Sequence, residues 1–156
     1  MDANSSNHNT ITLGNGDRDT VYADGNNHDT ISLGNGAGDR VDADTDSFGL
    51  VSSFDTIALG NGAGDAVDAD GSNHDRISLG NGINDFVSAD YSSFDTIILG
   101  NGAGDTVSAN GGSYDTITLG NGAGDTVTVN AVAEFFPRLF SAPTTKLRLV
   151  TAPVIR

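Results

Sequence analysis

Apolar and polar residues alternate along most of the chain, in runs of about five residues that are separated by turns rich in Gly, Asn and Asp. The stretch Asp29-Thr-Ile-Ser-Leu-Gly-Asn-Gly-Ala-Gly38 is followed by Asp39-Arg-Val-Asp-Ala-Asp44, and each half opens with Asp before two alternating apolar positions. Alternation over so few residues predicts short β-strands with one buried face, not helices.

The pattern repeats at a fixed interval of 20 residues, interrupted once by an interval of 26. Leu-Gly-Asn-Gly occurs six times, beginning at Leu13, Leu33, Leu59, Leu79, Leu99 and Leu119. Such self-similarity is typical of a solenoid. We therefore expect an all-β fold, a parallel β-roll or β-solenoid with two short strands and two turns per 20-residue rung. About six rungs at a strand spacing of about 4.8 Å give a rod about 30 Å long.

The two halves of each unit place different residues toward the expected core. First halves supply Ile and Leu, as in Ile97 and Leu99, and second halves supply Val and Ala, as in Val107 and Ala109. The sequence therefore predicts that a sheet of large residues faces a sheet of small residues. The inward positions leave Thr and Ser outside on the first sheet, where Ala58, Arg76 and Ile98 interrupt them.

Two segments depart from the repeat. Six extra residues, 45–50, lie between Asp44 and Asp55 and include Phe48 and Leu50. We expect them to form a surface loop, with a contact patch for a partner as the alternative. Residues 131–156 contain no Gly or Asp but hold four of the seven basic residues and all three prolines. We thus divide the chain into repeats over 1–130 and a tail over 131–156, which is a C-terminal cap, an assembly strand or the remnant of an export signal.

Charge limits the partners of the chain. The formal net charge is -14, and 20 of the 21 acidic residues are Asp. So acidic a chain is repelled by nucleic acid and by anionic lipid, so we expect neither nucleic-acid binding nor membrane insertion, and divalent cations are the natural counter-charge. The chain contains no Cys, which excludes thiolate ligands. The N-terminus lacks the basic and apolar parts of a signal peptide, so any export signal is expected elsewhere or to have been removed.

Asp residues precede nearly every expected strand and should form ladders along both edges of the solenoid. Like charges at that spacing repel by about 1 kcal/mol per pair even in water, and a cation between rungs turns the repulsion into binding. Calcium accepts six to eight oxygens, including carbonyls of a Gly-rich turn, and Mg²⁺ is less suited to such a cage. The alternative is that Asp only stabilises turns and solubilises the rod.

The candidate calcium ligands fall into four columns of equivalent positions. The first edge holds Asp19, Asp39, Asp65, Asp85, Asp105 and Asp125, together with Gly14, Gly34, Gly60, Gly80, Gly100 and Gly120. The opposite edge holds Asp29, Asp55, Asp75, Asp95 and Asp115, and a second set of acids at Asp24, Asp44, Asp70 and Asp90.

The run Gly34-Asn-Gly-Ala-Gly-Asp-Arg-Val41 resembles the nonapeptide of RTX (haemolysin-type) calcium-binding repeats, G-G-x-G-x-D-x-U-x, where U is large and apolar. The first Gly, the Asp and the apolar residue match. Ala37 stands where the family has Gly, and the period is ten instead of nine. The opposite turn, Asp24-Gly-Asn-Asn-His-Asp29, matches less well. The resemblance implies a parallel β-roll, several calcium ions bound between adjacent turns, and an extracellular or cell-surface protein that is exported by a type I route.

Other columns carry less chemistry. His8, His28, Phe54, His74, Phe94 and Tyr114 share one column, which we interpret as stacked rings and not as a zinc site. The Asn residues of the Leu-Gly-Asn-Gly turns are expected to form a hydrogen-bonded side-chain ladder. We find no nucleophile with a base and an orienting group, no phosphate-binding loop and no expected cleft, so the chain is not expected to be an enzyme.

The sequence favours a secreted structural or adhesive repeat domain whose folding is driven by calcium. The alternatives are a self-assembling extracellular fibre subunit, in which the ends or the tail join copies, and an ice-binding solenoid that uses the Thr and Ser face.

Overall fold

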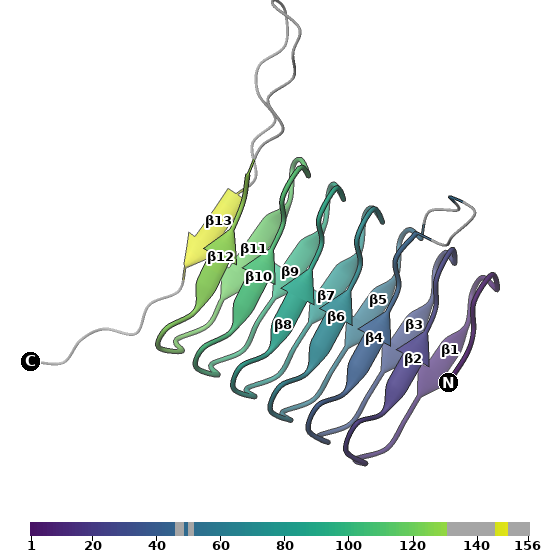
Figure 1. The fold of residues 1–156 in the computed structure, drawn as a ribbon, viewed down its shortest axis with the longest axis horizontal. Coiled ribbons are helices and arrows are strands. Elements are labelled where there is room, and N and C mark those ends of the chain that lie inside the picture. Colours follow the sequence, from purple (N-terminus) through teal and green to yellow (C-terminus); the bar gives the residue numbers. More distant parts are fainter. Residues whose placement is uncertain (46–48, 50–51, 131–145, 150–156) are drawn as a thin grey trace, which may run out of the picture.

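The computed structural model describes residues 1–45, 49, 52–130 and 146–149, and these residues form a parallel β-solenoid. Twelve strands make six rungs, and a thirteenth extends one sheet (Figure 1). The predicted fold class is confirmed. Within the described part of the chain there is no helix, and so none that is long and apolar enough to cross a membrane.

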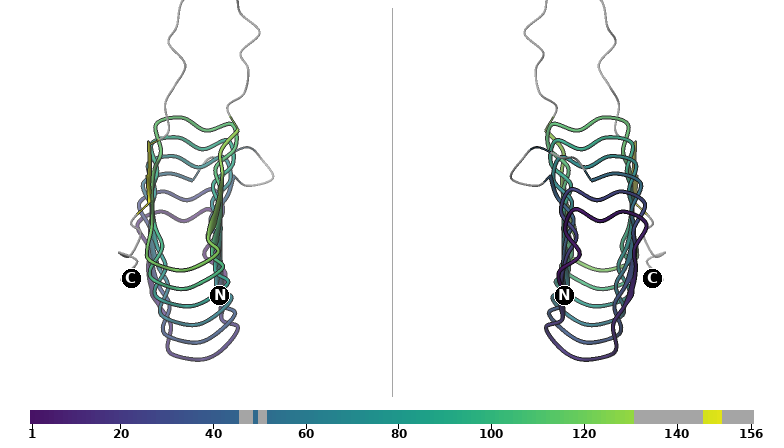
Figure 2. Two further views of the ribbon diagram at one scale, coloured as in Figure 1. Left: turned by 90° about the vertical axis from the view of Figure 1, so that its left-hand side faces the viewer. Right: turned by 90° about the vertical axis from the view of Figure 1, so that its right-hand side faces the viewer.

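Two sheets form the long sides of the solenoid. The strands of the seven-stranded sheet are β1 (Thr10–Thr12), β3 (Thr30–Ser32), β5 (Thr56–Ala58), β7 (Arg76–Ser78), β9 (Thr96–Ile98), β11 (Thr116–Leu119) and β13 (Lys146–Leu149). Those of the six-stranded sheet are β2 (Thr20–Tyr22), β4 (Arg40–Asp42), β6 (Ala66–Asp68), β8 (Phe86–Ser88), β10 (Thr106–Ser108) and β12 (Thr126–Thr128). Figure 2 shows the rungs as flattened loops stacked on one another.

Every strand pair is parallel and keeps equivalent residues of successive rungs opposite each other. Ile11 pairs with Ile31, and Val21 pairs with Val41. The 26-residue interval does not disturb this register, because Thr30 still pairs with Thr56. Of the inserted segment, only Thr45 and Gly49 lie among the described residues.

The core is a thin double layer of the predicted composition. Ile and Leu of the seven-stranded sheet face Val and Ala of the six-stranded sheet, and the central Ile, Val and Ala residues are at most 2% exposed. The strands are shorter than the five residues predicted, since most have three. The second inward residue already lies where the chain begins to turn. Its N–H still bonds to the neighbouring rung, as that of Leu13 does to the carbonyl of Ser32 at 2.9 Å.

Candidate functional site

The turns on the two edges of the solenoid differ in composition. We call the edge formed by residues 14–19, 34–39, 60–65, 80–85, 100–105 and 120–125 the glycine edge. We call the edge formed by residues 4–9, 24–29, 44–45, 52–55, 70–75, 90–95 and 110–115 the serine edge. On both edges the last residue of the turn is the Asp, or in the first rung Asn9, that precedes a strand.

These Asp side chains point into the solenoid. The predicted ligands Asp29, Asp39, Asp55, Asp65, Asp75, Asp85, Asp95, Asp105 and Asp115 are at most 2% exposed. In each column, one carboxylate oxygen accepts a hydrogen bond from the backbone N–H of the equivalent residue one rung earlier. Asp65 N donates to Oδ1 of Asp85 at 3.0 Å, and Asp29 N donates to Oδ1 of Asp55 at 2.7 Å. The ladders are therefore part of the hydrogen-bond framework of the stack.

The second oxygen lacks a hydrogen-bond partner along the glycine edge, whereas on the serine edge it has one in some turns only. On the glycine edge, Oδ2 of Asp39, Asp65, Asp85 and Asp105 is buried and has no hydrogen-bond partner. On the serine edge, Asn26 donates to Oδ2 of Asp29 at 3.0 Å, and the Ser72 hydroxyl donates to Oδ2 of Asp75.

The residue three positions before each Asp decides whether a side-chain donor is available. That residue is Gly in every turn of the glycine edge, whereas the serine edge has Ser or Asn there except at Gly112. Not every serine makes the bond. The hydroxyls of Ser52 and Ser92 bond to backbone carbonyls, and Oδ2 of Asp55 and of Asp95 is also buried without a hydrogen-bond partner.

The second glycine of each Leu-Gly-Asn-Gly turn brings backbone oxygens close to the unpartnered carboxylates. A Cβ on Gly82 would lie 1.6 Å from the carbonyl oxygen of Gly62 and 2.9 Å from Oδ2 of Asp85. A Cβ on Gly102 would lie 1.4 Å from the carbonyl oxygen of Gly82 and 3.1 Å from Oδ2 of Asp105. Only glycine fits there, and a carbonyl of one rung and a carboxylate of the next converge on the same place.

Burial without a cation makes these carboxylates hard to ionise. It raises the pKa of Asp85 to about 6. The nearby carboxylates of Asp105 and Asp65 also raise this pKa, whereas the hydrogen bond from the Asp65 N–H lowers it. Burial likewise raises the pKa of Asp65 and Asp105 on the same edge. On the serine edge, burial raises the pKa of Asp55 to about 7. Ionising these groups in the folded chain therefore costs free energy, which a bound proton or metal ion would offset.

The predicted acids Asp24, Asp44, Asp70 and Asp90 form an outer column at the start of the serine-edge turns. In the later rungs hydroxyl donors stabilise the charged form of this column: Ser88 donates to Oδ1 of Asp70 at 2.6 Å, and Ser108 donates to Oδ1 of Asp90 at 2.7 Å. Although burial acts to raise the pKa of Asp90, hydrogen bonds from Ser108 and Asn110 outweigh it, and the pKa is lowered.

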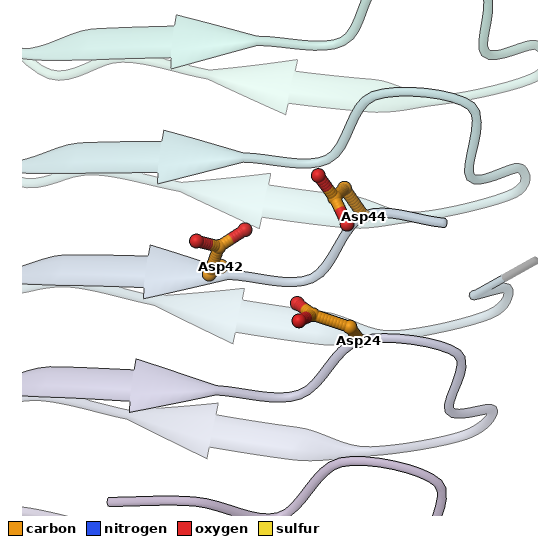
Figure 3. A group of neighbouring side chains, drawn as sticks. All are labelled: Asp24, Asp42 and Asp44. Atoms are coloured by element: carbon orange, nitrogen blue, oxygen red, sulfur yellow. The ribbon is translucent and has the colours of Figure 1, made fainter. Parts of the chain in front are cut away.

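In the earlier rungs the donor serine is replaced by an acid. Asp42 and Asp68 occupy the positions of Ser88 and Ser108, and ligand oxygens of Asp24, Asp42 and Asp44 lie within 4.8 Å of one another (Figure 3). Burial raises the pKa of Asp44 to about 6, and Asp24 and Asp42 raise it further. Arg40 offsets part of the charge, at 2.9 Å from Asp42 and 3.3 Å from Asp68.

Asp42, Asp68 and the second glycines are site residues that the sequence analysis missed. The signal for the glycines was present, because Gly16, Gly36, Gly62, Gly82, Gly102 and Gly122 recur in all six turns. The predicted Gly14 and Gly60 have less to offer a cation through their carbonyls, which accept the N–H of Gly34 at 3.1 Å and of Gly80 at 2.9 Å. Asp19 and Asp125, at the ends of the glycine edge, are only partly buried.

The aromatic and asparagine columns lie as predicted. Rings from His8 to Tyr114 stack with centroids 4.7–5.1 Å apart. Asn side chains of the glycine edge accept the backbone N–H of the next Asn, as Oδ1 of Asn61 does from Asn81 N at 2.9 Å.

Comparison with protein-family models, with curated proteins and with solved structures finds no match. The chain is a β-solenoid repeat protein with Asp ladders along both edges.

Proposed function

We propose that this solenoid is a calcium-binding structural repeat domain in which Ca²⁺ binds between adjacent rungs of the glycine edge and drives folding. The observation that carries the proposal is the row of buried, unpartnered Oδ2 atoms at Asp39, Asp65, Asp85 and Asp105. Leaving an ionised carboxylate buried without a counter-ion costs several kcal/mol, and four such groups in one column would oppose stacking. A column of cations removes that cost.

The chemistry of the donor set favours calcium over other ions. The glycine edge offers only oxygens, from carboxylates and from backbone carbonyls, as calcium prefers. Among the described residues, the only group of three or more possible metal ligands with oxygens close together is Asp24, Asp42 and Asp44, which contains no His. Mg²⁺ needs a tighter octahedral shell and retains its waters, so an edge built from carbonyls binds it less well.

The resemblance of the turns to RTX repeats supports the same ion and suggests where the protein acts. Calcium sites of extracellular modules bind at about 10⁻⁴–10⁻³ M, a concentration range that is met outside cells. A domain that folds only there fits a secreted or cell-surface protein with a structural or adhesive role, not a catalytic one.

The outer carboxylates Asp24, Asp42 and Asp44 form a second, weaker place for calcium in this proposal. They are more exposed to solvent than the inner column, and Arg40 already neutralises part of their charge. No observation favours the ice-binding alternative, because the register places Arg76 in the same row as the Thr residues.

A calcium titration of two matched variants tests the proposal. Asp85→Asn removes an unpartnered carboxylate of the glycine edge, whereas Asp75→Asn changes a serine-edge carboxylate that Ser72 already satisfies. Calorimetry should show fewer bound ions or at least tenfold weaker binding for Asp85→Asn, and little change for Asp75→Asn.

Circular dichroism of the unaltered chain is the second measurement. Strand signal should be small in excess chelator at pH 7.5 and should grow on addition of Ca²⁺. A full strand signal in chelator, together with no heat of calcium binding, would falsify the proposal.

A further inference from the structure

The two ends of the solenoid are offset by half a rung. At the N-terminal end, residues 1–3 add a segment to the outer side of β2, where Tyr22 N donates to Met1 O and Ala3 N donates to Tyr22 O, both at 2.8 Å. The other sheet ends at β1, and within the described chain no strand pairs with its outer side.

The C-terminal end is offset in the opposite sense. There β13 extends the seven-stranded sheet beyond β11, with Leu147 opposite Ile117 and Leu149 opposite Leu119. The six-stranded sheet ends at β12, which has no described strand on its outer side. In the described solenoid, the six-stranded sheet thus projects at the N-terminal end, and the seven-stranded sheet projects at the C-terminal end (Figure 1).

These two ends are complementary. Strands of a continuing solenoid alternate between the sheets, so the next strand position after β13 lies beside β12. Residues 1–3 occupy the equivalent position beside β2. We propose that copies of this chain join head to tail, with residues 1–3 of one copy paired with β12 of the copy before it, and β1 paired with β13.

The hydrogen bonds of the joint follow from those within the chain. Tyr22 N donates to Met1 O and Ala3 N donates to Tyr22 O, so the same ladder directs Asp2 N to the carbonyl of Val127 and Val129 N to the carbonyl of Asp2. In the other sheet, the bond from Leu13 N to Ser32 O is continued by one from Leu149 N to Thr12 O. The joint adds parallel ladders of the kind already present in every rung.

Core burial is incomplete where the joint would form. Val127 is only partly buried although Val107 is fully buried, and Val129 is 39% exposed where Ala109 is fully buried. At the other end, Leu13 is only partly buried. A further rung would cover all three residues, as it covers their equivalents inside the stack.

Charge favours the head-to-tail arrangement over like ends meeting. Residues 131–156 carry four basic residues and one acidic residue, whereas residues 1–130 carry three basic and twenty acidic residues. Lys146 and Arg148 lie in the strand at the C-terminal end, and Asp2 lies in the N-terminal segment. Head-to-tail joining therefore brings the strand that holds Lys146 and Arg148 to the acidic repeats of the next copy and keeps two such strands apart.

Cysteine pairs test the register directly, since the chain contains no Cys. Asp2 and Thr128 become neighbours across the joint, so Asp2→Cys combined with Thr128→Cys should form disulfide-linked dimers, trimers and longer ladders on air oxidation. The off-register pair Asp2→Cys with Thr126→Cys separates the α-carbons by about 8 Å, too far for a disulfide. We expect at least fivefold less linked material from it.

A blocked edge gives the second readout. Thr12→Pro removes an N–H on the open side of β1, and Thr12→Val retains it. In sedimentation velocity, the unaltered chain and Thr12→Val should form oligomers that grow with concentration, whereas Thr12→Pro should remain monomeric with an unchanged circular dichroism spectrum.

Monomers only for the unaltered chain, or equal cross-linking by the two cysteine pairs, would overturn the joint. The joint does not depend on the calcium proposal. A chain that folds with calcium but stays monomeric contradicts only the joint. Oligomers that form equally well with and without calcium contradict only the calcium proposal.

Discussion

Oδ2 of Asp85 lies 2.9 Å from the position that a β-carbon on Gly82 would occupy, three residues earlier in the same turn. That position is also 1.6 Å from the carbonyl oxygen of Gly62. The place of the missing side chain is therefore taken by a backbone oxygen of one rung, beside a carboxylate oxygen of the next. Glycine at this point of the turn allows the rungs to stack closely, and it also allows the two oxygens to approach the same place.

Gly82→Ala should weaken both the fold and calcium binding. The added methyl group overlaps a backbone oxygen that cannot move without separating two rungs, which corresponds to a loss of about 1–3 kcal/mol or more in the free energy of unfolding. Thermal unfolding at saturating calcium measures the loss.

Gly64→Asn is the matched control for that substitution. Gly64 has a positive φ of 74° and no neighbouring atom within 4 Å of its Cβ position, and Asn84 occupies the equivalent place with φ of 60°. We expect little change in unfolding temperature or calcium affinity. Equal effects of the two substitutions would refute the role assigned to the second glycine.

The calcium-free chain should become more stable as the pH falls. The pKa of Asp55 and Asp95 is raised to about 7 and that of Asp85 to about 6, mainly by burial, above the 3.8 of an unperturbed Asp. The folded state therefore binds protons more tightly than the unfolded state. This contribution is complete below about pH 4 and is lost as the pH rises through about 6 to 7.

Circular dichroism in chelator between about pH 8 and pH 5 checks this prediction, and strand signal should grow as the solution becomes more acidic. Calcium affinity should fall over the same range, because protons compete for the same oxygens. A calcium-free chain that loses structure between pH 8 and pH 5 would contradict the assignment.

Ser72→Ala should create an unpartnered carboxylate on the serine edge. The Ser72 hydroxyl donates to Oδ2 of Asp75, and its removal leaves a buried oxygen without a donor, at a cost of about 1–3 kcal/mol in the free energy of unfolding. Ser78→Ala, on the outward side of β7, is the control, with an expected effect below about 0.5 kcal/mol. Urea unfolding at saturating calcium compares the two. Equal stability would show that Ser72 does not satisfy Asp75.

Asp68→Ser should stabilise the calcium-free chain at neutral pH. Ser88 and Ser108 show that a hydroxyl at this position donates to the outer carboxylate one rung earlier, so the new hydroxyl can donate to Asp44. Loss of one like charge and gain of one donor are together worth about 1 kcal/mol in the free energy of unfolding. Ser88→Ala should have the opposite effect, since Asp70 loses its hydroxyl donor and keeps only the backbone N–H of Asp90. Urea unfolding of both variants at pH 7 in chelator measures these changes. A destabilised Asp68→Ser variant would contradict the proposed hydrogen bond from residue 68 to Asp44.

The sequence was sufficient for the fold because a fixed interval places identical residues in columns. The alternation of Ile31 and Leu33 or Val41 and Ala43 then identifies the buried side of each sheet. Strand length was less predictable, because the last inward residue keeps its hydrogen bond while the backbone turns.

The site was only partly predictable. The columns of Asp followed from the interval, but which carboxylate oxygen finds a donor depends on how each turn folds back on itself. Ser72 and Ser52 are equivalent in sequence and differ in their hydrogen bonds. The approach of Asp42 to Asp24 joins a strand position to a turn position of the neighbouring rung, a relation that appears only when the rungs are stacked.

The pairing of Thr30 with Thr56 across an interval of 26 residues has a practical meaning. The strands of this rung keep their register although the connection between them on the serine edge is six residues longer than in the other rungs. The serine edge therefore tolerates connections of different length. Foreign peptides grafted between Asp44 and Ser52, or at the corresponding point of any other rung, should therefore be displayed at intervals of about 4.8 Å along a rigid scaffold.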